Sequence, residues 1–148
     1  MKSRQPWAVI LGAVAASSLL LAGCSSSTGE KSDGLNVVAT TTQLCDYVTQ
    51  IGRAAAEKED SLSFTKVDAA GTSTTVGGDS GTRASTLNLT CLLAPNASAH
   101  SHEMTVNQMK ALSSADLFLV NGVDLEHFLD DAVSSSGFHG TMVVSSGV

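Results

Sequence analysis

The sequence predicts an α/β domain in which a parallel sheet is flanked by helices. Short apolar or β-branched runs at 35–39, 87–93, 117–120 and 142–144 alternate with stretches of helical period. Alternation of strands and helices favours parallel strands joined by right-handed crossovers. The run 117–120 is apolar at every position, as expected for a strand that is covered on both faces.

The first half of the domain is predicted to contain a strand at 35–39 and a helix that begins at the threonines 40–42. Hydroxyl side chains cap helices, and apolar residues follow at helical spacing: Leu44, Tyr47, Val48 and Ile51. Gly52 is predicted to end this helix, and residues 62–67 alternate as a strand does. Residues 71–85 are rich in Gly, Ser and Thr, so we expect a mobile surface insertion there.

The second half repeats the alternation of strand and helix. In the strand at 87–93, alternate residues share one face and Leu92 points to the other. Thr105 and Gln108 have the spacing of a capping box, and the helix that they open is predicted to turn Val106, Met109 and Leu112 inward. Asp124 is predicted to cap a third helix, whose apolar stripe consists of Leu125, Phe128, Leu129, Ala132 and Val133.

The N-terminal residues have the pattern of a lipoprotein signal peptide. Lys2 and Arg4 precede a run without charge at 7–21, which is shorter than the ~20 residues of a membrane-spanning helix. The run ends in Leu-Ala-Gly-Cys, a lipobox, so residues 1–23 are predicted to be the signal peptide and Cys24 the lipidation site. Residues 24–34 then form a flexible tether, and 35–148 the domain. The alternative is an ordinary secretory signal with a chance cysteine.

Charge and cysteine content indicate which partners the mature chain can have and in which state its cysteines can be. The net charge is −6, and all 14 carboxylates follow Cys24, which argues against a nucleic-acid partner. In an oxidising compartment, Cys45 and Cys91 form either a disulfide or two buried free thiols that pack as small hydrophobic side chains. The sequence leaves both readings open, because bridging depends on the separation of the Cα atoms.

His100 and His102 form the candidate metal site. They follow a predicted strand, and side chains at i and i+2 of an extended segment project to the same side. Imidazole is the commonest side-chain metal ligand, and ligands gather at the carboxyl ends of strands in open α/β sheets. The alternative is a pair of solvated loop histidines, and two imidazoles do not complete a tetrahedral zinc site. His127 and His139 are assigned no role.

A serine-protease-like motif at 78–81, Gly-Asp-Ser-Gly, does not indicate an enzyme. Every histidine of the chain follows Ser80, which is incompatible with the His, Asp, Ser order of chymotrypsin-like proteases. The hydrolase elbow G-x-S-x-G would need glycine at position 82, where the chain has Thr82. We therefore expect no catalytic activity.

Four segments in order resemble one family: 37–42, the stretch from Leu93-Ala94-Pro95 to His100, 115–122, and 124–129. They are similar to the zinc/manganese-binding lipoproteins that serve as substrate-binding proteins of metal ABC transporters, the TroA-like family. The resemblance implies the N-terminal lobe of a bilobal periplasmic-binding-protein-like fold, with His100 as a direct metal ligand. It also implies that the remaining ligands come later than Val148, so the chain is expected to be a fragment or a truncated product. His102 stands where relatives usually carry an aromatic residue, and is a second candidate ligand.

The function implied by this resemblance is capture of Zn²⁺ or Mn²⁺ outside the cytoplasm by a lipid-anchored protein. The protein would hand the ion to an ABC permease that is powered by a separate ATPase subunit. The alternative is a surface lipoprotein that binds an organic ligand or a partner protein. Imidazole suits zinc and oxygen ligands suit manganese, and the sequence does not decide between the two ions.

Overall fold

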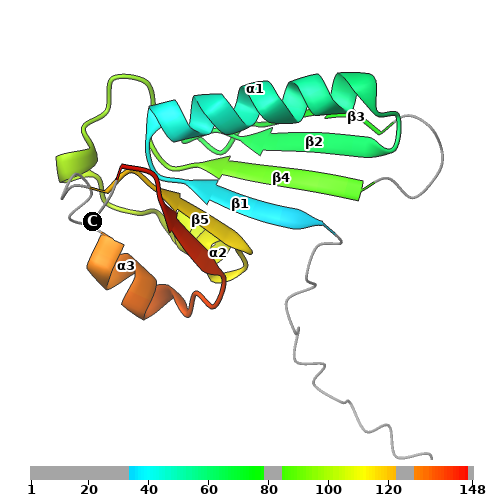
Figure 1. The fold of residues 1–148 in the computed structure, drawn as a ribbon. Helices are drawn as coiled ribbons and strands as arrows, with labels where there is room; N and C mark the ends of the chain where they lie inside the picture. Colours follow the sequence, from blue (N-terminus) through cyan, green and yellow to red (C-terminus); the bar gives the residue numbers. More distant parts are fainter. Residues whose placement is uncertain (1–33, 79–84, 123–128, 147–148) are drawn as a thin grey trace, which may run out of the picture. The chain divides into compact units, whose positions relative to one another are not determined.

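In the computed structural model, residues 34–78, 85–122 and 129–146 are described. Their strands form one sheet of six, and helices lie on both faces (Figure 1). The elements in chain order are β1 Leu35–Ala39, α1 Thr42–Lys58, β2 Leu62–Val67, β3 Ser73–Gly77, β4 Ser85–Cys91, the 3₁₀ turn η1 Ala99–Ser101, α2 Val106–Ser113, β5 Leu117–Val120, α3 Leu129–Ser136 and β6 Thr141–Val144. The predicted signal peptide, Cys24, Ser80, Asp124 and His127 lie outside the described residues.

The sheet has the strand order β3-β2-β4-β1-β5-β6. Every neighbouring pair is parallel except β2 and β3, which are antiparallel. The central strand β1 pairs with β4 on one side, where Val37 lies opposite Leu89, and with β5 on the other, where Val37 lies opposite Leu117. The predicted α/β class with a parallel sheet is therefore confirmed.

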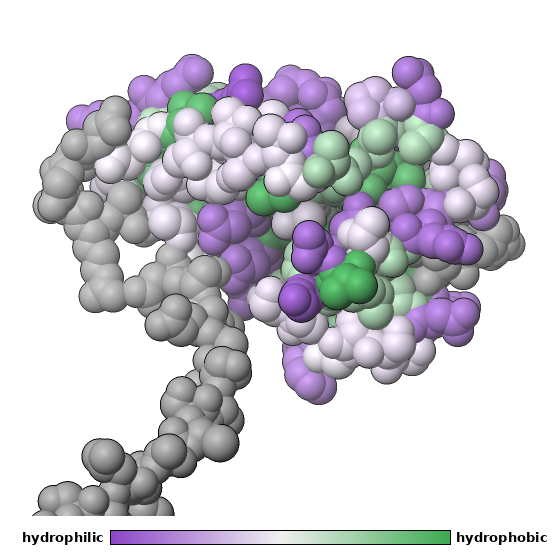
Figure 2. Space-filling view, turned by 180° about the vertical axis from the view of Figure 1, so that it is seen from behind, coloured by the Kyte–Doolittle hydropathy of each residue, from purple (hydrophilic) through white to green (hydrophobic). Residues whose placement is uncertain are grey.

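Alternation along β1 divides the interior into two cores, one on each face of the sheet. Val37 and Ala39 pack beneath α1, whereas Val38 packs with α2 and α3 on the opposite face. Phe64 fills the first core and Phe118 the second, and both are essentially inaccessible to solvent. On the face shown in Figure 2, hydrophobic side chains form small, separated patches among hydrophilic ones. No helix among the described residues is long and apolar enough to cross a membrane.

Helix α1 differs from its prediction in length and in the face that it buries. It continues through Gly52 to Lys58, and Tyr47 and Ile51 of the expected apolar stripe are 61% and 68% exposed. Leu44 is buried and Val48 is partly buried against the core, as predicted. The other buried residues of the helix are small: Cys45, Thr49, Gly52 and Ala56. A Cβ atom at Gly52 would lie 2.5 Å from the ring of Phe64. The helix therefore lies close to the sheet through its small residues, and Tyr47 and Ile51 of the expected stripe face solvent.

The segment at 71–85, expected to be a mobile insertion, contains a strand in its described part. Ser73–Gly77 form β3 and pair with β2, which was correctly predicted at 62–67. Asp68 shapes the turn between them, because its Oδ1 atom accepts hydrogen bonds from the backbone N–H groups of Ala70 (3.0 Å) and Thr72 (2.8 Å). Composition alone did not predict the strand at Ser73–Gly77, where β-branched threonines suit a strand.

The later elements follow the prediction with small shifts. The strand expected at 87–93 begins at Ser85 and ends at Cys91. The capping box of α2 is present, but Val106 is 73% exposed instead of turning inward, and Gln108 is buried instead. Val106 occupies the first helical position, where the side chain projects away from the core of the domain.

Candidate functional site

The carboxyl ends of the parallel strands share one edge of the sheet, and the candidate site lies there. At this edge, β1 leads into the threonines that start α1. Thr40 donates its backbone N–H to the carbonyl oxygen of Leu119 (3.0 Å), and the hydroxyl of Thr41 accepts from the backbone N–H of Leu44 (3.4 Å). Both threonines are almost fully buried. These hydrogen bonds fix the start of α1 next to β5 at the carboxyl edge of the sheet.

The segment that follows β4, residues 92–104, carries both candidate histidines, and we call it the histidine loop. Its first residue is held by β1, since the backbone N–H of Leu92 donates to the carbonyl oxygen of Ala39 (3.0 Å). Within the loop, Asn96 adopts a left-handed conformation with φ of 66°, and the backbone N–H of Ala97 closes a turn on the carbonyl oxygen of Ala94 (3.0 Å). The loop crosses the carboxyl edge of the sheet before it enters α2 (Figure 1).

His100 lies in the 3₁₀ turn η1 and is exposed, whereas His102 is the capping residue after that turn and is half-buried. The hydroxyl of Ser98 accepts a hydrogen bond from the backbone N–H of His100 (3.3 Å) and so caps the turn. The Nε2 atom of His102 is shielded from solvent. The extended segment that was expected to carry both imidazoles is therefore wrong for His100, which lies in a 3₁₀ turn. His102, directly after the turn, has extended backbone angles.

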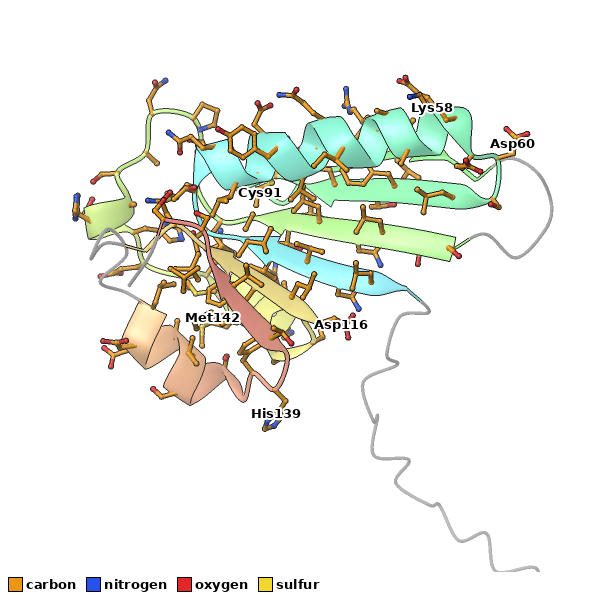
Figure 3. All side chains as sticks on the ribbon, viewed as in Figure 1. Lys58, Asp60, Cys91, Asp116, His139 and Met142 are labelled. Atoms are coloured by element: carbon orange, nitrogen blue, oxygen red, sulfur yellow. A yellow bond between two sulfur atoms is a disulfide. The ribbon has the colours of Figure 1, made fainter. Side chains whose placement is uncertain are left out.

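The histidine loop does not contain a complete metal site. Across the described parts of the chain, no group of three or more His, Cys, Asp or Glu side chains is arranged to hold a metal ion. His139 is exposed and precedes β6, so it lies at the opposite edge of the sheet from the loop (Figure 3). His100 and His102 are thus the histidines that the structure places at the carboxyl edge.

The structure joins Cys45 and Cys91 in a disulfide, with the Cα atoms 5.5 Å apart. Cys45 lies in the first turn of α1 and Cys91 is the last residue of β4, directly before the histidine loop. Of the two arrangements left open by the sequence, the structure has the bridged one. Sequence reasoning placed Cys45 in the first predicted helix and Cys91 in the strand that precedes the loop, and the bond joins these two elements.

Sequence reasoning identified Gln108 as part of the capping box but missed its second contact, with the start of the histidine loop. Its side-chain Oε1 accepts a hydrogen bond from the backbone N–H of Thr105 (3.0 Å), and its Nε2 donates to the carbonyl oxygen of Leu92 (2.9 Å). The two ends of the histidine loop therefore lie close together. The Thr-x-x-Gln spacing revealed the capping box, whereas the contact with Leu92 depends on the tertiary fold.

A mostly parallel sheet of six strands with helices on both faces is consistent with the N-terminal lobe of a periplasmic binding protein. In agreement with this class, residues 37–148 match the family model described as "zinc-uptake complex component A periplasmic" (ZnuA). Because the match covers most of the sequence, the chain belongs to this family of metal-binding substrate-binding proteins. The resemblance stated from the four sequence segments is thereby confirmed. A comparison with curated proteins found no match.

Proposed function

We propose that the chain is the extracytoplasmic, lipid-anchored component of a zinc or manganese import system, and that His100 is one of its metal ligands. Family membership supports the metal-binding role. The single observation that carries the assignment of the ligand is the position of His100, which is exposed on a capped turn at the carboxyl edge of the sheet. Open α/β folds gather their ligands at this edge.

The ion would be held by an incomplete set of ligands in this part of the molecule. Zinc sites in proteins are usually tetrahedral with nitrogen, sulfur or oxygen ligands, so other ligands must come from outside the described residues. Zinc is the ion that the family description names, and imidazole nitrogen suits zinc better than manganese. His102 is the second candidate ligand, and rotation of its shielded Nε2 would be needed before that atom could bind an ion.

Anchoring and delivery complete the proposal. Cys24 ends a lipobox-like sequence, and its acylation would hold the protein at the outer face of the cell membrane through the tether at 24–34. The captured ion would pass to an ABC permease, and a separate ATPase subunit would supply the energy. The protein itself would act by binding and would catalyse no reaction.

Zinc titration of two variants tests the ligand assignment. In competition with a chromophoric chelator, His100→Ala is expected to lower the affinity for Zn²⁺ at least tenfold, because one ligand is lost. His139→Ala is the matched control, since it removes an exposed histidine at the opposite edge of the sheet, and its affinity is expected to equal that of the unmodified protein. Equal affinity of the His100→Ala variant and the control would refute His100 as a ligand.

A further inference from the structure

The disulfide lies where the histidine loop leaves the sheet, so it restrains the start of the loop that carries the candidate site. It joins residues that are 46 positions apart in the sequence. One partner, Cys45, belongs to α1, whose start is fixed by the buried threonines, and the other ends β4. The backbone N–H of the next residue, Leu92, donates a hydrogen bond to the carbonyl oxygen of Ala39 in β1. The bond therefore ties the root of the loop covalently to the first turn of α1.

A cavity of 340 Å³ lies beside the disulfide. Its walls include both cysteines and the first residues of the histidine loop, Leu93 and Pro95, together with Lys66 and Asp68 from the end of β2. The cysteine residues are 7% and 2% exposed, so the bond is covered by the domain but faces this cavity. A small thiol that enters the cavity would meet the disulfide and the root of the loop together.

We propose that the Cys45–Cys91 bond is a redox-sensitive crosslink that positions the histidine loop for metal binding. This inference rests on the proposed function of His100. With the bond intact, the root of the loop is fixed to α1 and His100 is held in one place relative to the other ligands. With the bond reduced, Cys91 at the root of the loop is held to α1 by non-covalent contacts alone, and the loop gains freedom that metal binding must remove. Ligands that are loosely held bind metals more weakly.

The chemical step is an ordinary thiol–disulfide exchange with a dithiol reductant. One thiolate of the reductant attacks a sulfur of the disulfide and forms a mixed disulfide, and its second thiol then releases the protein. Two electrons and two protons pass to the protein, which gains two thiols, while the reductant becomes a cyclic disulfide.

The test uses the full chain and Zn²⁺ alone as the probe. Cys45→Ala/Cys91→Ala is the informative variant, because it removes the bond without creating free thiols that would bind zinc themselves. We expect its affinity for Zn²⁺ to fall about tenfold. Amide hydrogen exchange is expected to become faster in the histidine loop, residues 92–104, and to stay unchanged in β5. Phe64→Leu is the matched control, since Phe64 belongs to the same core as both cysteines but is not part of the bond.

The outcomes separate this inference from the proposed function. If the double-alanine variant keeps full zinc affinity while His100→Ala loses it, the proposed role of the crosslink is refuted and the metal site stands. If neither variant changes the affinity, the metal site itself is refuted. If Phe64→Leu lowers the affinity as much as loss of the bond does, the effect is general destabilisation and the proposed role of the crosslink is again refuted.

Reduction of the unmodified protein by a phosphine serves as the second measurement if the double-alanine variant does not fold. Faster exchange at residues 92–104 on reduction, with β5 unchanged, is the expected result. Exchange in the loop that is identical before and after reduction would overturn the proposal.

Discussion

The side chain of Gln108 donates a hydrogen bond of 2.9 Å to the carbonyl oxygen of Leu92 and so links the start of α2 to the start of the histidine loop. The same side chain accepts from the backbone N–H of Thr105 as part of the capping box. Gln108 is only 6% exposed. One buried amide therefore satisfies backbone groups at both ends of the loop that carries His100.

Gln108→Ala is expected to lower the free energy of unfolding by about 1–3 kcal/mol, because it leaves the buried carbonyl group of Leu92 without this donor and removes half of the capping box. Urea denaturation followed by circular dichroism measures the change. Asn107→Ala is the matched control on the same turn of α2, where the side chain is exposed. A loss in Gln108→Ala no greater than in Asn107→Ala would contradict the role given to this amide.

Gly52→Ala is expected to destabilise the protein by about 1–3 kcal/mol, although alanine is the better helix former. The added Cβ atom would lie 2.5 Å from the ring of Phe64, which is too close without a shift of the helix or the ring. A double-mutant cycle with Phe64→Leu measures the coupling, which we expect to exceed about 0.5 kcal/mol because the two residues are in contact. Additive effects of the two substitutions would show that this contact does not determine how closely α1 packs.

These contacts show why the sequence predicted the elements better than their orientation. The strands at Leu35–Ala39 and Leu117–Val120 were predicted because apolar patterning is a local signal. The buried face of α1 was predicted only in part, because Gly52 and Cys45 face the sheet for reasons that lie in β2 and β4, where Phe64 and Cys91 meet them. Strand β3 was missed because a segment of Ser, Thr and Gly resembles a loop until a partner strand satisfies its backbone groups.

The candidate site shows the same division between local and tertiary information. The position of His100 in the loop after a strand could be read from the sequence, and the family match agrees with the segments that suggested it. The 3₁₀ turn at Ala99–Ser101, which is capped by the hydroxyl of Ser98, was not predicted, because an extended segment was expected there.

Asp68→Ala is expected to loosen the β2–β3 hairpin without unfolding the domain. The substitution removes the carboxylate that accepts from two backbone N–H groups in the turn, and exposed hydrogen bonds of this kind contribute about 1 kcal/mol. Hydrogen exchange is expected to become faster in Ser73–Gly77 and to remain unchanged in β1. Asp68→Asn should restore protection, because the asparagine side chain supports the same turn. Equal exchange in β3 for the Ala variant and the unmodified protein would count against this account of the turn.

Direct observation of the imidazole nitrogens tests the central claim that His100 binds the metal ion. In a long-range ¹H–¹⁵N NMR spectrum of the full chain, addition of Zn²⁺ is expected to shift one ring nitrogen of His100 strongly, because that nitrogen would donate its lone pair to the metal ion. The ring nitrogens of His139, at the opposite edge of the sheet, should not move. A zinc-induced shift at His139 with none at His100 would contradict the account.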